Sequence, residues 1–135
     1  MKKDGILNSE ISSVLSYMGH TDCICIADCG LPIPKETKRI DLALKIGQPS
    51  FIDTLKEMVN NLKVEKIILA EEIKVHNENI LEEIKNIFKD VETDFKIEFI
   101  AHNQFKELTK NCKAVIRTGE ATPYANIILQ SSCIF

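Results

Sequence analysis

The sequence lacks the features that mark several large classes of protein. No apolar run approaches the roughly 20 residues that cross a bilayer, and no hydrophobic segment follows the charged N-terminus. Neither sign of charge dominates, because 17 basic and 20 acidic residues leave a net charge of -3. This balance gives no electrostatic reason to expect nucleic acid or a membrane as a partner. We therefore expect a cytoplasmic protein.

The sequence also lacks the short motifs of several common enzyme classes. It contains no G-x-G-x-x-G dinucleotide motif, no G-x-x-x-x-G-K-[ST] phosphate loop and no G-x-S-x-G nucleophile elbow. These absences argue against the standard forms of redox, kinase and esterase chemistry.

Cysteines are present, but their spacing is not typical of a metal site. The strongest candidate set is His20, Cys23, Cys25 and Cys29. Two of these, Cys23 and Cys25, would face the same side of an apolar strand, and there is no C-x-x-C pair. Buried cysteine commonly packs as a small hydrophobic residue, so we expect no metal ion. The total of five is odd, which fits free thiols in the cytoplasm.

What the sequence does contain is an alternation of helical and strand patterns. Its 135 residues, 44% of them hydrophobic, suffice for one folded domain, which we place at 1–135. The patterns predict helices at 9–18, 51–62, 78–88 and 102–110, and strands at 23–27, 39–44, 66–70, 96–101, 113–117 and 125–129. Asn8 and Ser50 have the side chains expected of helix N-caps. Strands that alternate with helices favour a single layered α/β domain.

Two polar residues flank the first predicted strand. His20 follows Gly19, which we expect to end the first helix in a left-handed conformation. A histidine there can also simply cap the last carbonyls of the helix. Asp28 follows the strand at its carboxyl end, where open α/β sheets bind their ligands. Its alternative role is an Asx turn before Gly30.

A second group of polar residues lies in the C-terminal half. Tyr124 and Asn126 alternate with Ala125, so they would share one face of a strand. A proline-containing turn with a half-buried tyrosine is the alternative. His102 begins a predicted short helix and, taken alone, would be read as a surface histidine. The pair Glu71-Glu72 ends a predicted strand, as either a structural feature or a support for the site.

A series of short motifs runs through essentially the whole chain. In order they are Gly19-His20-Thr21-Asp22, Asp28-x-Gly30-Leu31-Pro32-Ile33-Pro34, Arg39-Ile40-Asp41-x-Ala43-Leu44, Pro49-Ser50-Phe51, Ala70-Glu71-Glu72-Ile73-Lys74, His102-x-Gln104-Phe105-Lys106 and Ala114-Val115-Ile116-Arg117-x-Gly119-Glu120-x-x-Pro123-Tyr124-Ala125-Asn126-Ile127-Ile128-Leu129. Each motif alone is weak, but their joint order resembles the D-ribose pyranase family. Residues between about 75 and 101 carry little of this resemblance.

The resemblance implies an isomerase that interconverts the pyranose and furanose forms of free D-ribose without a cofactor. It also implies a ring-shaped homo-oligomer, a decamer in the family. By matched position, the acid–base histidine of the family falls on His20. The ligand-binding aspartate falls on Asp28, the second histidine on His102, and the C-terminal binding tripeptide on Tyr124-Ala125-Asn126. Lys106 matches a family lysine near the sugar.

Two other functions remain open at this point. The fucose mutarotases are a sister group, so another free sugar such as L-fucose is an alternative substrate. A non-catalytic sugar-binding module that uses the same pocket is the second alternative. The Asp-x-Gly-Leu-Pro-Ile-Pro loop and Pro-Tyr-Ala-Asn resemble the ribose branch.

We also expect the site to be shared between subunits, because a chain this small has limited depth for a closed sugar pocket. In this hypothesis, His20 and Asp28 of one subunit meet Tyr124 and Asn126 of its neighbour. A site within one subunit is the alternative, since a single fold can join distant segments.

Overall fold

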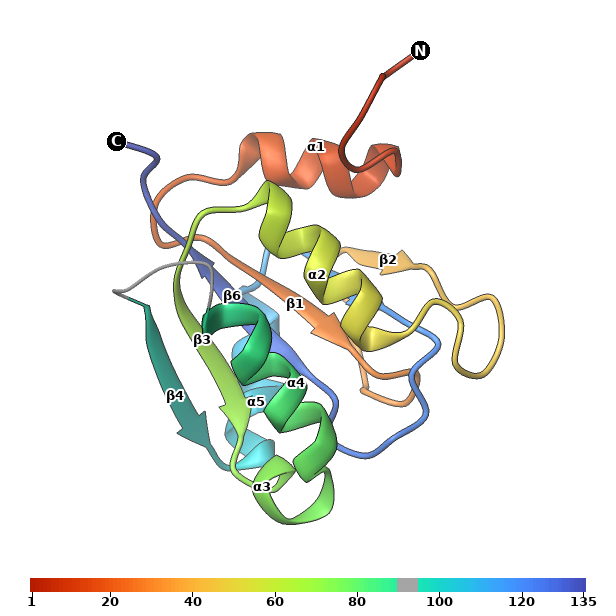
Figure 1. Cartoon of the computed structure of the whole chain (residues 1–135), viewed down its shortest axis with the longest axis vertical. Coiled ribbons are helices and arrows are strands. Elements are labelled where there is room, and N and C mark those ends of the chain that lie inside the picture. Colours follow the sequence, from red (N-terminus) through yellow and green to blue (C-terminus); the bar gives the residue numbers. More distant parts are fainter. Residues whose placement is uncertain (90–94) are drawn as a thin grey trace.

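A computed structural model describes residues 1–89 and 95–135 of the chain (Figure 1). The helices are α1 (Ser9–Tyr17), α2 (Phe51–Asn61), α3 (Ile73–His76), α4 (Glu78–Lys89) and α5 (His102–Leu108), which continues into the 3-10 helix η1 (Thr109–Asn111). The strands are β1 (Cys23–Ala27), β2 (Arg39–Asp41), β3 (Val64–Ala70), β4 (Lys96–Ile100), β5 (Val115–Arg117) and β6 (Ile127–Ser131). The predicted α/β class is confirmed.

Within the described residues, the strands form one six-stranded sheet in the order β2-β5-β1-β6-β3-β4. β6 runs antiparallel to both of its neighbours, β1 and β3. The other pairs are parallel. The carboxyl ends of β1, β2, β3, β4 and β5 therefore meet at one edge of the sheet, together with the beginning of β6. We call this the carboxyl edge, and the other the amino edge.

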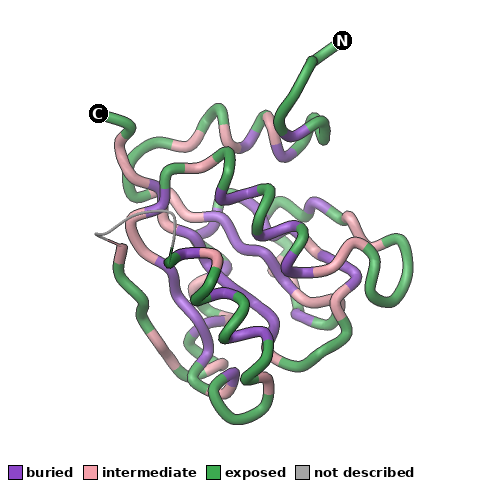
Figure 2. Tube along the Cα trace, in the orientation of Figure 1, coloured by how far each residue is buried: buried purple, intermediate pink, exposed green. Residues whose placement is uncertain are grey.

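Helices cover both faces of the sheet. In Figure 1, α2 and α4 lie in front of the sheet and α5 lies behind it. Side chains of β1 alternate accordingly: Ile24 and Ile26 join the larger core under α2 and α4, whereas Cys25 and Ala27 join a smaller core with Phe105 of α5. This two-sided burial explains why the inner strands read as continuous apolar runs (Figure 2). No helix in the described part is long and apolar enough to span a bilayer.

The helix starts follow the predicted capping chemistry. The side chain of Asn8 accepts a hydrogen bond from the Ile11 N–H at 2.9 Å. The Ser50 hydroxyl likewise accepts one from the Asp53 N–H at 3.0 Å. Each bond satisfies a backbone donor that the first turn of a helix leaves without a partner.

Three local predictions were wrong. The first helix ends at Tyr17, and Gly19 is not left-handed; that conformation belongs to Thr21, with φ 69°. The last strand begins at Ile127 rather than 125, because Tyr124 has φ 57° and its carbonyl accepts the Asn126 N–H at 2.9 Å, which closes a turn at these residues. The four-residue helix α3 was not predicted, since only Ile73 of its residues is buried and no apolar periodicity marks it.

Gly119 connects the loop after β5 to the loop after β2. Its N–H donates to the Pro49 carbonyl at 2.9 Å, and its own carbonyl accepts from the Gly47 N–H at 2.6 Å. A Cβ atom on Gly119 would overlap the Lys45 carbonyl oxygen and lie 2.5 Å from the backbone nitrogen of Gln48. Backbone atoms on this side leave no room for any side chain.

We predict that Gly119→Ala lowers the free energy of unfolding by about 1–3 kcal/mol, because the backbone of the facing loop must move. Urea unfolding followed by circular dichroism measures the change. Gly19→Ala is the matched control, since the nearest atom to its added Cβ is the Asp22 Oδ2, 3.8 Å away. Equal stability of the two variants would contradict the prediction.

Candidate active site

A reciprocal pair of hydrogen bonds joins Asp28 and Asn126 at the carboxyl edge. The Asp28 N–H donates to Asn126 Oδ1 at 2.9 Å, and Asn126 Nδ2 donates to Asp28 Oδ2 at 2.8 Å. Asn126 is buried, and the second carboxylate oxygen of Asp28 accepts the N–H groups of Gly30 and Leu31. Asp28 therefore forms the expected Asx turn and also lies at the edge of the sheet where ligands of α/β proteins bind. The carboxylate is held in one orientation beside a hollow of about 260 Å³.

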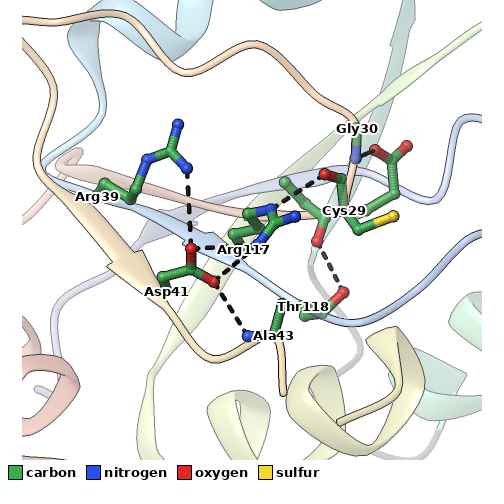
Figure 3. A network of polar contacts seen from close by, with 9 residues as sticks. Cys29, Gly30, Arg39, Asp41, Ala43, Arg117 and Thr118 are labelled. Carbon is green, nitrogen blue, oxygen red and sulfur yellow. Dashed lines mark hydrogen bonds and ion pairs between the residues drawn. The ribbon is translucent and has the colours of Figure 1, made fainter. Parts of the chain in front are cut away.

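An arginine on β5 holds the backbone that carries Asp28 (Figure 3). Arg117 donates from Nε to the Cys29 carbonyl at 3.0 Å and from Nη1 to both Asp41 carboxylate oxygens at 3.1 Å. The Thr118 hydroxyl also donates to the Ala27 carbonyl at 2.8 Å. These bonds fix the chain on both sides of Asp28.

His102 is the first residue of α5 and lies at the same edge. Its backbone N–H is accepted by both carboxylate oxygens of Glu72, at 3.1 and 3.0 Å. Donation by the backbone N–H groups of Glu72 itself and of His102 holds the pKa of the Glu72 carboxyl below its ordinary value. Glu72 thus holds the backbone of His102 in place. This is the supporting role that the sequence left open for the pair Glu71-Glu72.

The imidazole of His102 has an unusual environment. Among the described residues, its Nδ1 is the only buried side-chain nitrogen or oxygen without a hydrogen-bond partner. Burial, and secondarily the positive charge of Lys106, lowers the pKa of His102. The ring is therefore neutral at physiological pH, with one nitrogen available to a ligand.

Tyr124 completes this group of residues. Its left-handed backbone is uncommon for a large side chain and is a recurrent feature of functional sites. The ring lies edge-on to His102, with centroids 5.1 Å apart, and 5.4 Å from the ring of His76. Asn77 supports the preceding turn by donating to the Pro123 carbonyl at 2.8 Å. We expected Tyr124 and Asn126 to share one face of a strand, but both residues precede β6, so this strand alternation does not apply to them.

We call Asp28, His102, Tyr124, Ala125 and Asn126 the binding cluster. All five predicted binding residues lie at the carboxyl edge, since each follows or precedes a strand that ends or begins there. Lys106 lies one helical turn after His102. Sequence analysis missed His76 and Asn77, because α3 left no periodic signal. Glu72 had been singled out only by its place at the end of a strand.

His20 lies at the amino edge, before β1. Its segment is fixed to the end of β6 by the Thr21 N–H, which donates to the Ser131 carbonyl at 3.0 Å, and by the Ser131 hydroxyl, which donates to Gly19. The Asp22 carboxylate accepts the Gly19 N–H at 2.9 Å. The exposed imidazole contacts Glu65, with Nε2 and Oε2 2.9 Å apart.

The predicted division of the site is therefore wrong in one respect. Asp28 belongs with Asn126 in the binding cluster, and not with His20. The five residues of β1 separate His20 from Asp28 by about 16 Å, at roughly 3.3 Å per residue. In one chain, His20 and the binding cluster therefore lie at opposite edges of the sheet.

The cysteines of the first strand pack as expected from their apolar surroundings. Cys25 is buried, and burial raises the pKa of its thiol well above the ordinary value. Burial also raises the pKa of the neighbouring Cys112 thiol to about 12. A thiol in this state stays protonated at neutral pH, whereas metal binding and nucleophilic chemistry require the thiolate.

We predict a pH dependence for His102. Its pKa in the folded protein lies below the ordinary value of 6.5, so the unfolded chain binds the proton more readily. Stability from this group is complete above pH 6.5 and is lost as the pH falls through the folded pKa. An NMR titration of the ring, assigned with His102→Asn, should give a midpoint below 6.5. A midpoint at or above that value would contradict the prediction.

Known proteins resemble this chain in both sequence and fold. The chain is 58% identical to the D-ribose pyranase of Geobacillus thermodenitrificans over 100% of this chain and 99% of the relative. It is 50% identical to Bacillus subtilis RbsD, solved in complex with D-ribose, with a TM-score of 0.94 over 100% of both chains. The fucose mutarotase of Streptococcus pneumoniae, in complex with L-fucose, shares the fold at 23% identity, with a TM-score of 0.81 over 96% of this chain and 95% of that chain. Residues 1–134 match one family throughout, and the family resemblance seen in the sequence is confirmed: the chain belongs to the RbsD / FucU transport protein family.

Proposed function

We propose that this chain is an isomerase that interconverts the pyranose and furanose forms of free D-ribose. The observation that carries the proposal is full-length identity above one half to proteins named D-ribose pyranase, 58% and 56% in two cases. The similarity to an RbsD structure that contains D-ribose supports the same sugar. The unpartnered Nδ1 of His102 and the hollow beside Asp28 both lie at the carboxyl edge, and together they support a polar ligand there.

The reaction needs proton transfer and little else. Ring opening moves a proton from the anomeric hydroxyl to the ring oxygen as the carbon–oxygen bond breaks and the aldehyde forms. Reclosure through a different hydroxyl gives the other ring size. No electron and no group leaves the sugar, so the chemistry itself requires no cofactor. Positioned acid–base catalysis is worth about 10²–10⁴-fold, which suits a reaction that already occurs in water.

The residues divide this task between binding and proton transfer. In the proposal, His20 carries the proton, because an imidazole both donates and accepts near neutral pH. The fixed Asp28 carboxylate accepts hydrogen bonds from sugar hydroxyls. The amide of Asn126, the neutral ring of His102 and Tyr124 orient the sugar, with Ala125 as the buried link between them.

A complete site then requires two subunits. Because His20 and the binding cluster lie at opposite edges of the sheet, we propose that His20 of one subunit meets the binding cluster of its neighbour. Contacts of this kind repeat head to tail and close into a ring, in keeping with the homo-decamer that the sequence resemblance implies. The proposal treats 1–135 as one domain that works in the cytoplasm.

We predict that the protein accelerates ring exchange of D-ribose, measured by NMR saturation transfer between the pyranose and furanose signals. His20→Ala should lower the catalysed rate by about 10²-fold or more, to near the uncatalysed rate, while ribose still binds. A parallel sample with L-fucose distinguishes the two sugars. Binding of ribose without faster exchange would favour the sugar-binding module, and full exchange by folded His20→Ala would exclude His20 as the acid–base group.

The shared site makes a second prediction. Neither His20→Ala nor Tyr124→Ala should be active alone, but mixed oligomers of the two should regain part of the exchange rate, because some interfaces pair an intact His20 with an intact binding cluster. Co-purification of differently tagged subunits verifies mixing. The matched control combines His102→Ala with Tyr124→Ala, which damage the same cluster and should not recover. No recovery in verified mixed oligomers of the first pair would contradict a shared site.

A further inference from the structure

Glu65 contacts His20 and is itself held by a second residue. It is the second residue of β3, and its Oε2 lies 2.9 Å from His20 Nε2. Its other oxygen, Oε1, accepts a hydrogen bond of 2.6 Å from Gln130 Nε2 on the adjacent strand β6. The carboxylate therefore bridges the imidazole and a strand in the middle of the sheet.

The ionisation of Glu65 decides which atoms donate and which accept in the hydrogen bonds between Gln130, Glu65 and His20. Hydrogen bonding to His20, and then to Gln130, holds the pKa of the Glu65 carboxyl below its ordinary value, so the group is ionised at neutral pH. An ionised carboxylate can only accept. Gln130 must then present its amide N–H, and His20 must carry hydrogen on Nε2. Nδ1 is the nitrogen left for exchange with a ligand.

The His20 side chain is 53% exposed, so the ring is open to a ligand. The pair borders a hollow of about 580 Å³ at the amino edge. Its lining is His20, Thr21, Glu65, Lys66, Lys96, Glu98 and Gln130. The Lys66 ammonium forms an ion pair with Glu98 at 3.2 Å. This lysine therefore does not compete with His20 for the Glu65 carboxylate.

We propose that Glu65 is the positioning residue for His20. It fixes the tautomer with hydrogen on Nε2 and makes Nδ1 the atom that exchanges the proton with the sugar. When Nδ1 takes up the proton released by the anomeric hydroxyl, the ring becomes an imidazolium, and the adjacent carboxylate stabilises that charge. The proton then leaves Nδ1 for the ring oxygen, and the histidine returns to its starting state. This role rests on the proposed function.

Glu65→Gln tests the tautomer directly. Gln130 still donates toward the former Oε1, so the new amide places its carbonyl there and turns its NH₂ group toward His20. The imidazole must then accept at Nε2, which moves the hydrogen to Nδ1. We expect ¹⁵N NMR of histidine-labelled protein, assigned with His20→Ala, to report the inverted tautomer in the absence of sugar. The catalysed exchange should fall by about tenfold or more, because the wrong nitrogen is protonated.

The matched control is the exchanged pair Glu65→Gln with Gln130→Glu. The carboxylate at 130 now accepts the amide N–H from 65, so the amide carbonyl again faces His20 and hydrogen returns to Nε2. The tautomer should revert and part of the exchange rate should recover. Ribose affinity should stay within about twofold of wild type in both variants, because the proposed role of Glu65 acts through His20 and the binding cluster is unchanged.

Two results for Glu65→Gln alone would overturn the role of Glu65: an unchanged tautomer, or an inverted tautomer with an unchanged exchange rate. A fall in rate that the exchanged pair does not reverse, despite a restored tautomer, would also overturn it. Failure of the proposed function looks different, since the wild-type protein would then show no ring exchange at all. The ¹⁵N measurement needs no sugar and so tests the contact independently of activity.

Discussion

The antiparallel placement of β6 between β1 and β3 is the constraint on which the rest of the structure depends. A strand that runs against its neighbours begins where they end and ends where they begin. Its first end therefore brings Asn126 to Asp28 at the carboxyl edge. Its last end brings Gln130 to Glu65 and Ser131 to the segment that carries His20. One strand thus supports both halves of the proposed chemistry.

The two halves differ in how they are built. The binding cluster is rigid: Asn126 is buried, the Asp28 carboxylate accepts several hydrogen bonds, and Glu72 holds the start of α5 below His102. Fixed hydrogen-bonding groups suit the recognition of a small ligand with many hydroxyls, because little entropy is lost when it binds. The half with His20 is open, and within residues 1–89 and 95–135 the only hydrogen-bond partner of the imidazole is Glu65. In the proposed shared site, a neighbouring subunit would cover the exposed imidazole and give the proposed acid–base group a dry environment.

Features with a local cause could be predicted from the sequence. The caps at Asn8 and Ser50, the inner strands and the Asx turn at Asp28 each depend on side chains within a few residues of one another. The errors fell where tertiary contacts override local preference. Tyr124 takes a left-handed conformation that its own sequence disfavours, and the rings of His76 and His102 pack against it. The short helix α3 forms although a single buried residue anchors it.

The sequence by itself determined the α/β class, the family and the identity of the residues that carry the proposed chemistry, because strand periodicity and motif order are written along the chain. Only the tertiary structure decided which of these residues meet. Contacts such as Asp28 with Asn126 and His20 with Glu65 join segments that are 98 and 45 residues apart. Such pairing depends on strand order and direction, and an inner strand that is buried on both faces gives the same continuous apolar run in either direction. The direction of β6, which its apolar run does not reveal, places Asn126 beside Asp28 and not beside His20.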